Sequence, residues 1–291
     1  MDERDWLAQR FEEHRSHLRA VAYRMLGSLS EADDAVQDAW LRLSRSDAAA
    51  IENLGGWLTT VVARVSLNML RSRATHREEP LGVHIPDPIV DAAAGTNPEH
   101  EALLADSVGL ALLIVLETLS PAERLAFVLH DTFGVPFEEI APIVERSPEA
   151  TRQLASRARR RVQGERTVPD PDLVRQREVV DAFLAAAREG DFEALVAVLA
   201  PDVVLRADFG GGVTQEIRGA ETVARQAQTY SRLDLLVIPA LINGAVGAVS
   251  TRGGRPFSVG AITVRDGRIV ELDFLSDPER LAGLDLTVLD L

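Results

Sequence analysis

The sequence predicts a multidomain protein in which two all-α domains precede one α+β domain. Three observations support this: an apolar repeat of three and four residues through the first part of the chain, a proline-bearing break, and Val-, Ile- and Leu-rich runs after residue 200. A length of 291 residues suits two or three domains, and 46% apolar residues can fill their cores. We expect domains at 1–75, 99–166 and 173–291, with linkers at 76–98 and 167–172.

Composition excludes several classes of protein. There is no cysteine, which removes disulfides, zinc ribbons and thiol catalysis. No apolar run approaches the roughly 18 residues of a membrane span, and the N-terminus does not read as a signal peptide, so we expect a cytoplasmic protein without a membrane partner. The net charge is −14, but residues 167–291 carry −7 of it, which leaves basic stretches elsewhere that suit nucleic acid.

The first segment is helical by its apolar period. Apolar residues recur at three and four from Leu7 to Leu26, where Gly27 is expected to end the helix. Ser30 is expected to cap the next helix, and a third is predicted from about Gly56 to Arg73.

The sharpest local signal lies between residues 119 and 162. Ser120, Pro121 and Glu123 form a helix start, a short helix is expected over 137–144, and Ser147 caps a final helix after a tight turn. On a helical wheel the final helix has an apolar face of Thr151, Leu154, Ala155, Ala158 and Val162. The opposite face holds Glu149, Arg152, Gln153, Ser156 and Arg160.

This pattern is typical of a helix that enters the DNA major groove. Arg152 or Arg160 can bridge a guanine and Gln153 can bridge an adenine, with Ser156 beside them. Arg157, Arg159 and Arg161 are better placed for phosphates. The alternative is a solvated basic helix that packs only on its neighbours.

A second basic face lies on the helix over 57–73. Residues 61–77 contain four arginines and no acid. Arg64, Asn68 and Arg71 share one face, which suits phosphate contacts with an amide for base edges, and Arg73 lies close by. An ordinary solvent-exposed surface is the alternative here.

A narrow acidic stripe lies along the predicted helix that precedes residues 57–73 in the sequence. Asp34, Gln37, Asp38 and Leu41 recur at three and four residues and suit docking to a basic partner surface. For the nearby Asp33, compensation of the helix dipole is the preferred explanation.

In this order the three signals resemble the extracytoplasmic-function sigma factors of the sigma-70 family. His14 through Trp40 is similar to regions 2.1–2.2, Trp57 through Arg73 to regions 2.3–2.4, and Leu119 through Val162 to region 4. The resemblance implies binding of core RNA polymerase, through its β′ clamp and β flap, and of promoter DNA. It also implies that Asp34, Gln37 and Asp38 face the clamp helices of β′. The loop around 45–54 and the helix bearing Arg64 and Asn68 are implied to engage the −10 element, and the 147–162 helix to read the −35 element.

The last segment resembles a SnoaL-like domain of the NTF2-like cone fold. The resemblance is carried by 183–195, 199–204 and 264–269, where Asp266 and Gly267 form a hairpin turn. It implies a domain that regulates the sigma regions in cis, with contacts in the 208–213 loop and the 276–281 segment. The residues expected to make these contacts are Asp208, Gly210, Gly211, Asp277 and Arg280.

The rival hypothesis is a C-terminal pocket that binds a small-molecule ligand or carries isomerase- or cyclase-like activity. The side chains available for catalysis are Asp208, Asp273, Glu216, Asp234 and Tyr230, and the segment contains no histidine. We therefore expect no enzyme and no cofactor. His14 and His17 lack further ligands nearby, so no metal site is expected. A plain helix-turn-helix repressor would not need the 31–73 region.

Overall fold

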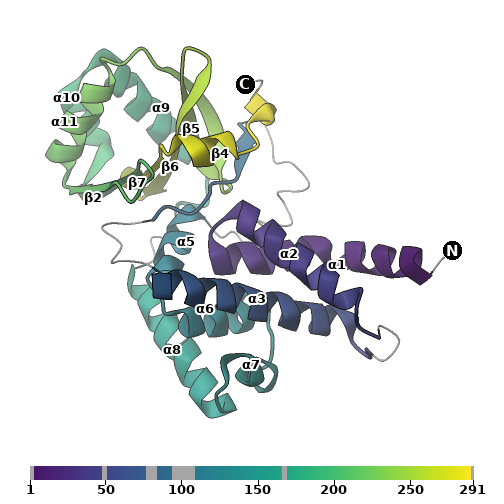
Figure 1. Ribbon diagram of the computed structural model, residues 1–291. Helices are drawn as coiled ribbons and strands as arrows, with labels where there is room; N and C mark the ends of the chain where they lie inside the picture. The colour runs from purple at the N-terminus through teal and green to yellow at the C-terminus, as the bar shows by residue number, and fades with distance from the viewer. Residues whose placement is uncertain (1–2, 48–50, 77–83, 94–108, 166–168, 290–291) are drawn as a thin grey trace. The chain divides into compact units, whose positions relative to one another are not determined.

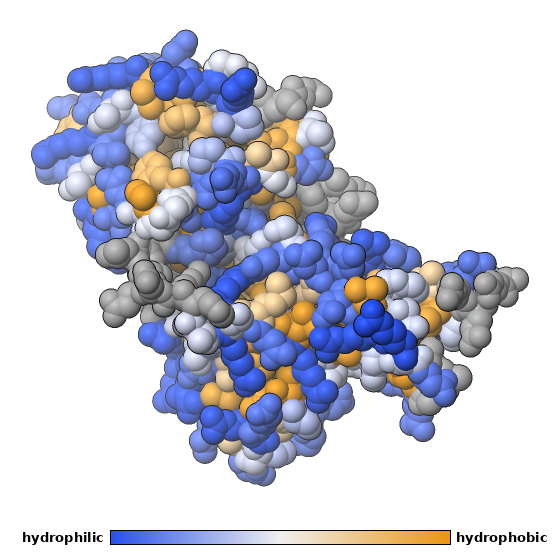
Figure 2. Space-filling view, viewed as in Figure 1, coloured by the Kyte–Doolittle hydropathy of each residue, from blue (hydrophilic) through white to orange (hydrophobic). Residues whose placement is uncertain are grey.

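A computed structural model describes residues 3–47, 51–76, 84–93, 109–165 and 169–289 (Figure 1). The chain divides into two compact units. Unit 1 combines residues 1–78, 101–106 and 115–165, and unit 2 combines residues 79–100, 107–114 and 166–291. Hydrophilic residues cover most of the face shown in Figure 2, in both units.

Unit 1 is entirely helical where the structure describes it. Its long helices are α1 (Glu3–Leu26), α2 (Leu29–Leu43), α3 (Leu54–His76) and α8 (Pro148–Glu165). Shorter elements are α6 (Pro121–Phe127), the π-helix η2 (Val128–Thr132) and α7 (Phe137–Val144). Helix α5 (Leu110–Glu117) begins in the residues of unit 2 and ends in those of unit 1.

The helix boundaries follow local chemistry. Gly27 has a φ of 68°, which suits a residue without a side chain and ends α1 as predicted. Ser120 and Glu123 form the predicted capping box at α6. The prediction that Ser30 caps α2 is wrong: the cap position is Ser28, in extended backbone, and Ser30 lies inside the helix.

Unit 2 is built on an open mixed sheet in the order β1-β4-β5-β6-β7-β2-β3. The strands are β1 (Val90–Ala92), β2 (Leu199–Asp208), β3 (Thr214–Arg218), β4 (Leu236–Ile242), β5 (Ala245–Arg252), β6 (Arg255–Arg265) and β7 (Arg268–Leu275). All neighbours are antiparallel except β2 and β7. The Asp266–Gly267 turn between β6 and β7 has positive φ at both residues, as the hairpin prediction requires.

Three helices cover one face of this sheet: α9 (Leu173–Glu189), α10 (Phe192–Val198) and α11 (Ala220–Tyr230) (Figure 1). A core joins α9 residues such as Val180 and Phe183 to Leu205 of β2 and Leu272 of β7. The expected fold class, helical domains followed by an α+β domain, is confirmed. Within the described ranges, no helix is both long enough and apolar enough to span a membrane.

Five elements of unit 2 were not expected from the sequence. They are β1, β3, α11, the short helix α12 (Pro278–Ala282) and the 3-10 helix η3 (Thr287–Leu289). Strand β1 lies within the stretch that the sequence indicated as a linker. It pairs antiparallel with β4, with Val90 opposite Ile242.

Candidate promoter and polymerase surfaces and the linker clamp

Helix α8 presents the two faces predicted for a recognition helix. Thr151, Ala155, Ala158 and Val162 are at most 3% exposed, whereas Leu154 is only half-buried. On the predicted outward face Glu149, Arg152, Gln153 and Arg160 are exposed and Ser156 is half-buried, and Arg157 and Arg161 are exposed as well. The Ser147 hydroxyl accepts from the Ala150 amide at 3.2 Å and so caps the helix.

At least three α8 arginines are held by neighbouring helices, and one of them, Arg159, donates to Asp131 of η2 at 2.7 Å. Arg152 lies 5.2 Å from the ring centre of Phe137 on α7. Arg157 donates to Glu123 at 3.0 Å. Partial burial would raise the pKa of Glu123, but hydrogen bonds from Ser120 and Arg157 outweigh it and lower the pKa below its usual value.

The basic face of α3 is partly as expected. Arg64, Asn68 and Arg71 are all exposed and share one side of the helix. Arg73 differs, because its guanidinium donates to the Leu26 carbonyl at 3.1 Å and pairs with Glu31 of α2. Arg73 therefore ties α3 to the α1–α2 corner in this structure.

The α2 stripe lies at the surface. Asp34, Gln37 and Leu41 are exposed, and the Asp38 carboxylate accepts from Arg42 one turn later at 2.9 Å. Asp33 stands apart from the stripe, since it accepts two hydrogen bonds from Arg19 of α1. That ion pair gives Asp33 a role in helix packing.

Inside unit 1, helix α1 contacts α6 and the residue that follows η2. Arg124 of α6 is 3% exposed, donates to the Met25 carbonyl at 2.9 Å and pairs with Glu117 at 2.7 Å. The ring of His17 meets that of Phe133 edge-on, with 5.1 Å between centroids. Burial and the nearby positive charges of His14 and Arg24 lower the pKa of His17, which favours the neutral ring. Neither His14 nor His17 belongs to a group of three or more metal-ligand side chains among the described residues.

Unit 2 contains an ionic cluster that holds residues 84–93, which we call the linker clamp. Its centre is Arg280, which donates to Asp208 at 3.0 Å, to Asp87 at 2.9 Å and to the Ile85 carbonyl at 2.6 Å. The Asp208 carboxylate also accepts from the Ile85 amide at 3.3 Å and lies 3.5 Å from the His84 ring. The clamp thus joins the end of β2, α12 and a segment more than a hundred residues earlier.

The glycine loop and the helix start complete the clamp. Gly210 donates to Asp208 at 3.0 Å, with a φ of 82°. An added Cβ there would lie 2.5 Å from the Asp277 carboxyl group, so the close approach requires glycine. Asp277 caps α12 by accepting from Glu279 and Arg280. Of the two glycines expected to make cis contacts, Gly211 differs from Gly210, because an added Cβ at Gly211 would meet nothing within 4 Å.

The charge balance of the clamp favours ionised Asp208. Burial alone would raise the pKa of this carboxyl. Hydrogen bonds from His84, Gly210 and Ile85, together with the charge of Arg280, outweigh burial, so the net pKa is lowered. Further along, the Ile89 amide donates to the Asn243 side chain at 3.1 Å and extends the attachment to β1.

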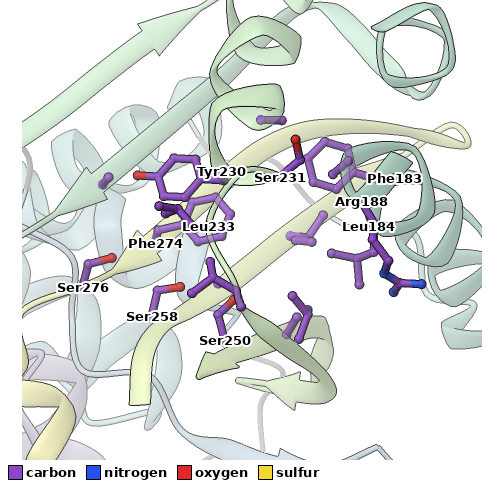
Figure 3. A pocket seen from close by; sticks show the side chains of 18 of the residues that line it. Phe183, Leu184, Arg188, Tyr230, Ser231, Leu233, Ser250, Ser258, Phe274 and Ser276 are labelled. Atoms are coloured by element: carbon purple, nitrogen blue, oxygen red, sulfur yellow. The ribbon is translucent and has the colours of Figure 1, made fainter. Parts of the chain in front are cut away.

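The candidate catalytic carboxylates do not line the pocket of unit 2. A cavity of about 290 Å³ opens between the helices and the concave face of the sheet (Figure 3). Asp273 alternates with Leu272 and Phe274, which face the core or the cavity, so Asp273 points to the other face. Asp273 is 1% exposed and pairs with Arg206 at 3.0 Å. Burial raises its pKa to about 7, although Arg206 opposes the shift.

Both helical regions of the chain match known protein families. Residues 10–76 match the sigma-70 region 2 family and residues 110–162 match the sigma-70 region 4 family. The chain is 39% identical over 293 residues to the ECF RNA polymerase sigma factor SigJ of Mycobacterium tuberculosis, covering 95% of this chain and 93% of the relative. It is 32% identical over 285 residues to the probable sigma factor SigI of the same species, covering 98% of each chain.

The fold agrees with the sequence comparison. The crystal structure of Mycobacterium tuberculosis SigJ superposes with a TM-score of 0.77 and 37% identity, covering 96% of this chain and 99% of that one. Similarity therefore extends through the C-terminal domain as well as both sigma regions. The chain belongs to the extracytoplasmic-function sigma factors, the transcription initiation factors that direct RNA polymerase to promoters.

Proposed function

We propose that this sigma factor reads promoters with α3 and α8, docks on core polymerase through the α2 stripe, and is controlled in cis by the linker clamp. The observation that carries the cis control is the Arg280 guanidinium bridging Asp87 of the linker and Asp208 of the C-terminal domain. Residues 84–93 lie between the two sigma regions in sequence, so whatever holds them limits how those regions can separate.

The number of residues between α3 and the clamp determines how strong the restraint is. With residue 84 held, only the seven residues 77–83 connect it to the end of α3. A chain of seven residues spans at most about 25 Å, whereas the 33 residues between α3 and α5 would span more than about 100 Å if none were held. Release of the clamp therefore changes the range of placements open to the two DNA-reading regions.

Run-off transcription with core polymerase tests this proposal. Arg280→Ala in the full chain should change transcript yield from a cognate promoter several-fold, in the same direction as a 1–166 truncation. Equal yields for the wild type, Arg280→Ala and the truncation, at equal promoter affinity, would remove cis control by the clamp.

A catalytic role for the pocket has less support. The residues that line the cavity include no aspartate, glutamate or histidine, so among them no side chain can act as a general base near pH 7. Asp208 serves the clamp, and Asp234 lies on an exposed loop. We infer that the pocket binds a molecule without converting it.

A further inference from the structure

The polar side chains of the C-terminal pocket form a pattern that packing does not explain. All four serines of residues 167–291 line this cavity, and so does Tyr230, the single tyrosine of that segment. Ser231 is exposed at the end of α11, and its hydroxyl donates to the Gln228 carbonyl at 2.7 Å. Serine gains little from an apolar site, so the presence of the other three in this cavity suggests a ligand. The rest of the wall is mostly apolar, with Phe183, Leu205 and Phe274 among its members.

Three of these serines form a row across three strands. Ser250 of β5 is directly opposite Ser258 of β6. The pairing of Val259 with Leu275 places Ser258 opposite Ser276 at the end of β7. Figure 3 shows the three side chains following one another along one wall, with Tyr230 facing the same cavity.

The hydroxyls of this serine row remain available. In the part of the chain that the structure describes, no hydrogen bond is made by the side chains of Ser250, Ser258, Ser276 or Tyr230. Ser258 is nevertheless only 6% exposed. The Ser258 hydroxyl oxygen is accessible from the cavity, so it can bond there to water or to a polar atom of a ligand.

We propose that the cavity binds a neutral, largely apolar small molecule that carries a hydroxyl or carbonyl oxygen, and that this oxygen bonds to the serine row. A volume of about 290 Å³ equals that of about ten waters at ~30 Å³ each, which suits a compact one- or two-ring molecule. A neutral ligand is favoured because, among the lining residues that the structure describes, Arg188 alone carries a full charge, and its side chain is exposed.

The same wall leads directly to the linker clamp. The Ser276 amide donates to the Asp208 carbonyl at 2.7 Å, and the next residue, Asp277, caps the helix that carries Arg280. A ligand bonded to Ser276 therefore orders the residues that hold the linker. This regulatory part of the inference rests on the proposed cis control, whereas the binding part stands without it.

Binding is tested on the full chain with fluorescent N-phenyl-1-naphthylamine, displaced by 2-naphthol, naphthalene or 2-naphthoate. We expect 2-naphthol to displace the probe about three- to tenfold better than naphthalene, as one additional hydrogen bond predicts. Ser258→Ala should remove that preference while leaving naphthalene unchanged. Thr229→Ala, which removes an exposed hydroxyl from α11 outside the cavity, should behave like the wild type.

Other outcomes would overturn the inference. Ala248→Leu places a larger side chain in the cavity, so undiminished probe binding to that variant would put the probe elsewhere. Equal affinities for 2-naphthol and naphthalene, or tighter binding of 2-naphthoate, would exclude the proposed ligand class.

The connection to the clamp has its own readout. Saturating 2-naphthol should slow hydrogen exchange of the Ser276 and Ile89 amides several-fold, and unchanged exchange would disprove the connection. These measurements need neither polymerase nor promoter, so their failure is distinct from a failure of the proposed transcription control.

Discussion

Replacing Arg280 by alanine should release residues 84–93 from the C-terminal domain. The side chains of Arg280, Asp87 and Asp208 are 20%, 12% and 6% exposed, so their contacts are largely shielded from water. Removal of Arg280 leaves two shielded carboxylates without their main cation. Breaking a fully buried pair costs about 3–5 kcal/mol.

The structure argues for a value somewhat below that range. Asp208 keeps the amides of Gly210 and Ile85, and Arg280 is partly exposed. A loss of about 2–4 kcal/mol in linker attachment follows, which corresponds to roughly a 30- to 900-fold rise in the detached population.

Hydrogen exchange of the β1 region measures this change. The Ile89 amide donates to Asn243, and 90–92 pair with β4, so these amides should exchange at least about 30-fold faster in Arg280→Ala. Arg225→Ala is the matched control, because its ion pair with Glu221 is about 70% exposed on both sides and contributes less than about 1 kcal/mol. Exchange within threefold of the wild type in Arg280→Ala would refute the clamp.

Three further predictions concern the other surfaces and the buried acid. Arg152→Ala should weaken binding to the −35 element by about 1–3 kcal/mol and change the base preference at one position. Arg161→Ala should instead weaken binding to all DNA sequences alike and lower the slope of log affinity against log salt concentration by about 1. If titrations with different promoters gave the same profile for both variants, the assignment of the two residues to different faces would be wrong. Asp38→Arg should abolish co-elution with core polymerase. The control Asp181→Arg, which reverses the charge of an exposed residue on α9, should leave co-elution unchanged. If Asp38→Arg still co-eluted with core polymerase, docking through the α2 stripe would be contradicted. The pKa of Asp273 is raised from 3.8 to about 7 in the folded state. Between about pH 4 and pH 7 the folded state therefore binds a proton at Asp273 that the unfolded state has released, so the free energy of unfolding falls as the pH rises through this range. In urea unfolding, Asp273→Asn should reduce the difference in free energy of unfolding between pH 5 and pH 8 by a few kcal/mol. An equal difference in the wild type and the variant would contradict the raised pKa of Asp273.

The sequence by itself determined the helical half of the protein and the two basic helix faces that we propose contact DNA. Helical periodicity and capping residues act within a few positions of each other, so Ser120 with Glu123, Gly27, and the inward face of α8 were readable without a fold. The hairpin at Asp266–Gly267 is equally local. The residues assigned to promoter and polymerase contacts remain predictions, although most of them lie at the surface.

Sequence patterns predicted secondary structure less well where few apolar residues are buried. Helix α11 buries Val223 and Ala224, too few apolar positions to give a clear period. Strand β3 alternates only between half-buried and exposed residues. The cap of α2 was misplaced by two residues because Ser28 and Ser30 are both good N-cap residues, and only the backbone conformation decides between them.

Only the tertiary structure brought together the contact partners of Arg73 and Arg280 and placed the serines of the row side by side. Arg73 looked like a phosphate contact, but the fold brings Glu31 and the Leu26 carbonyl to its guanidinium. The sequence indicated Asp208 and Arg280 as contacts, yet not that Asp87, some 190 residues from Arg280, would be their partner. Pairings at such separations depend on sheet order and register, which a helical wheel or a turn motif does not contain.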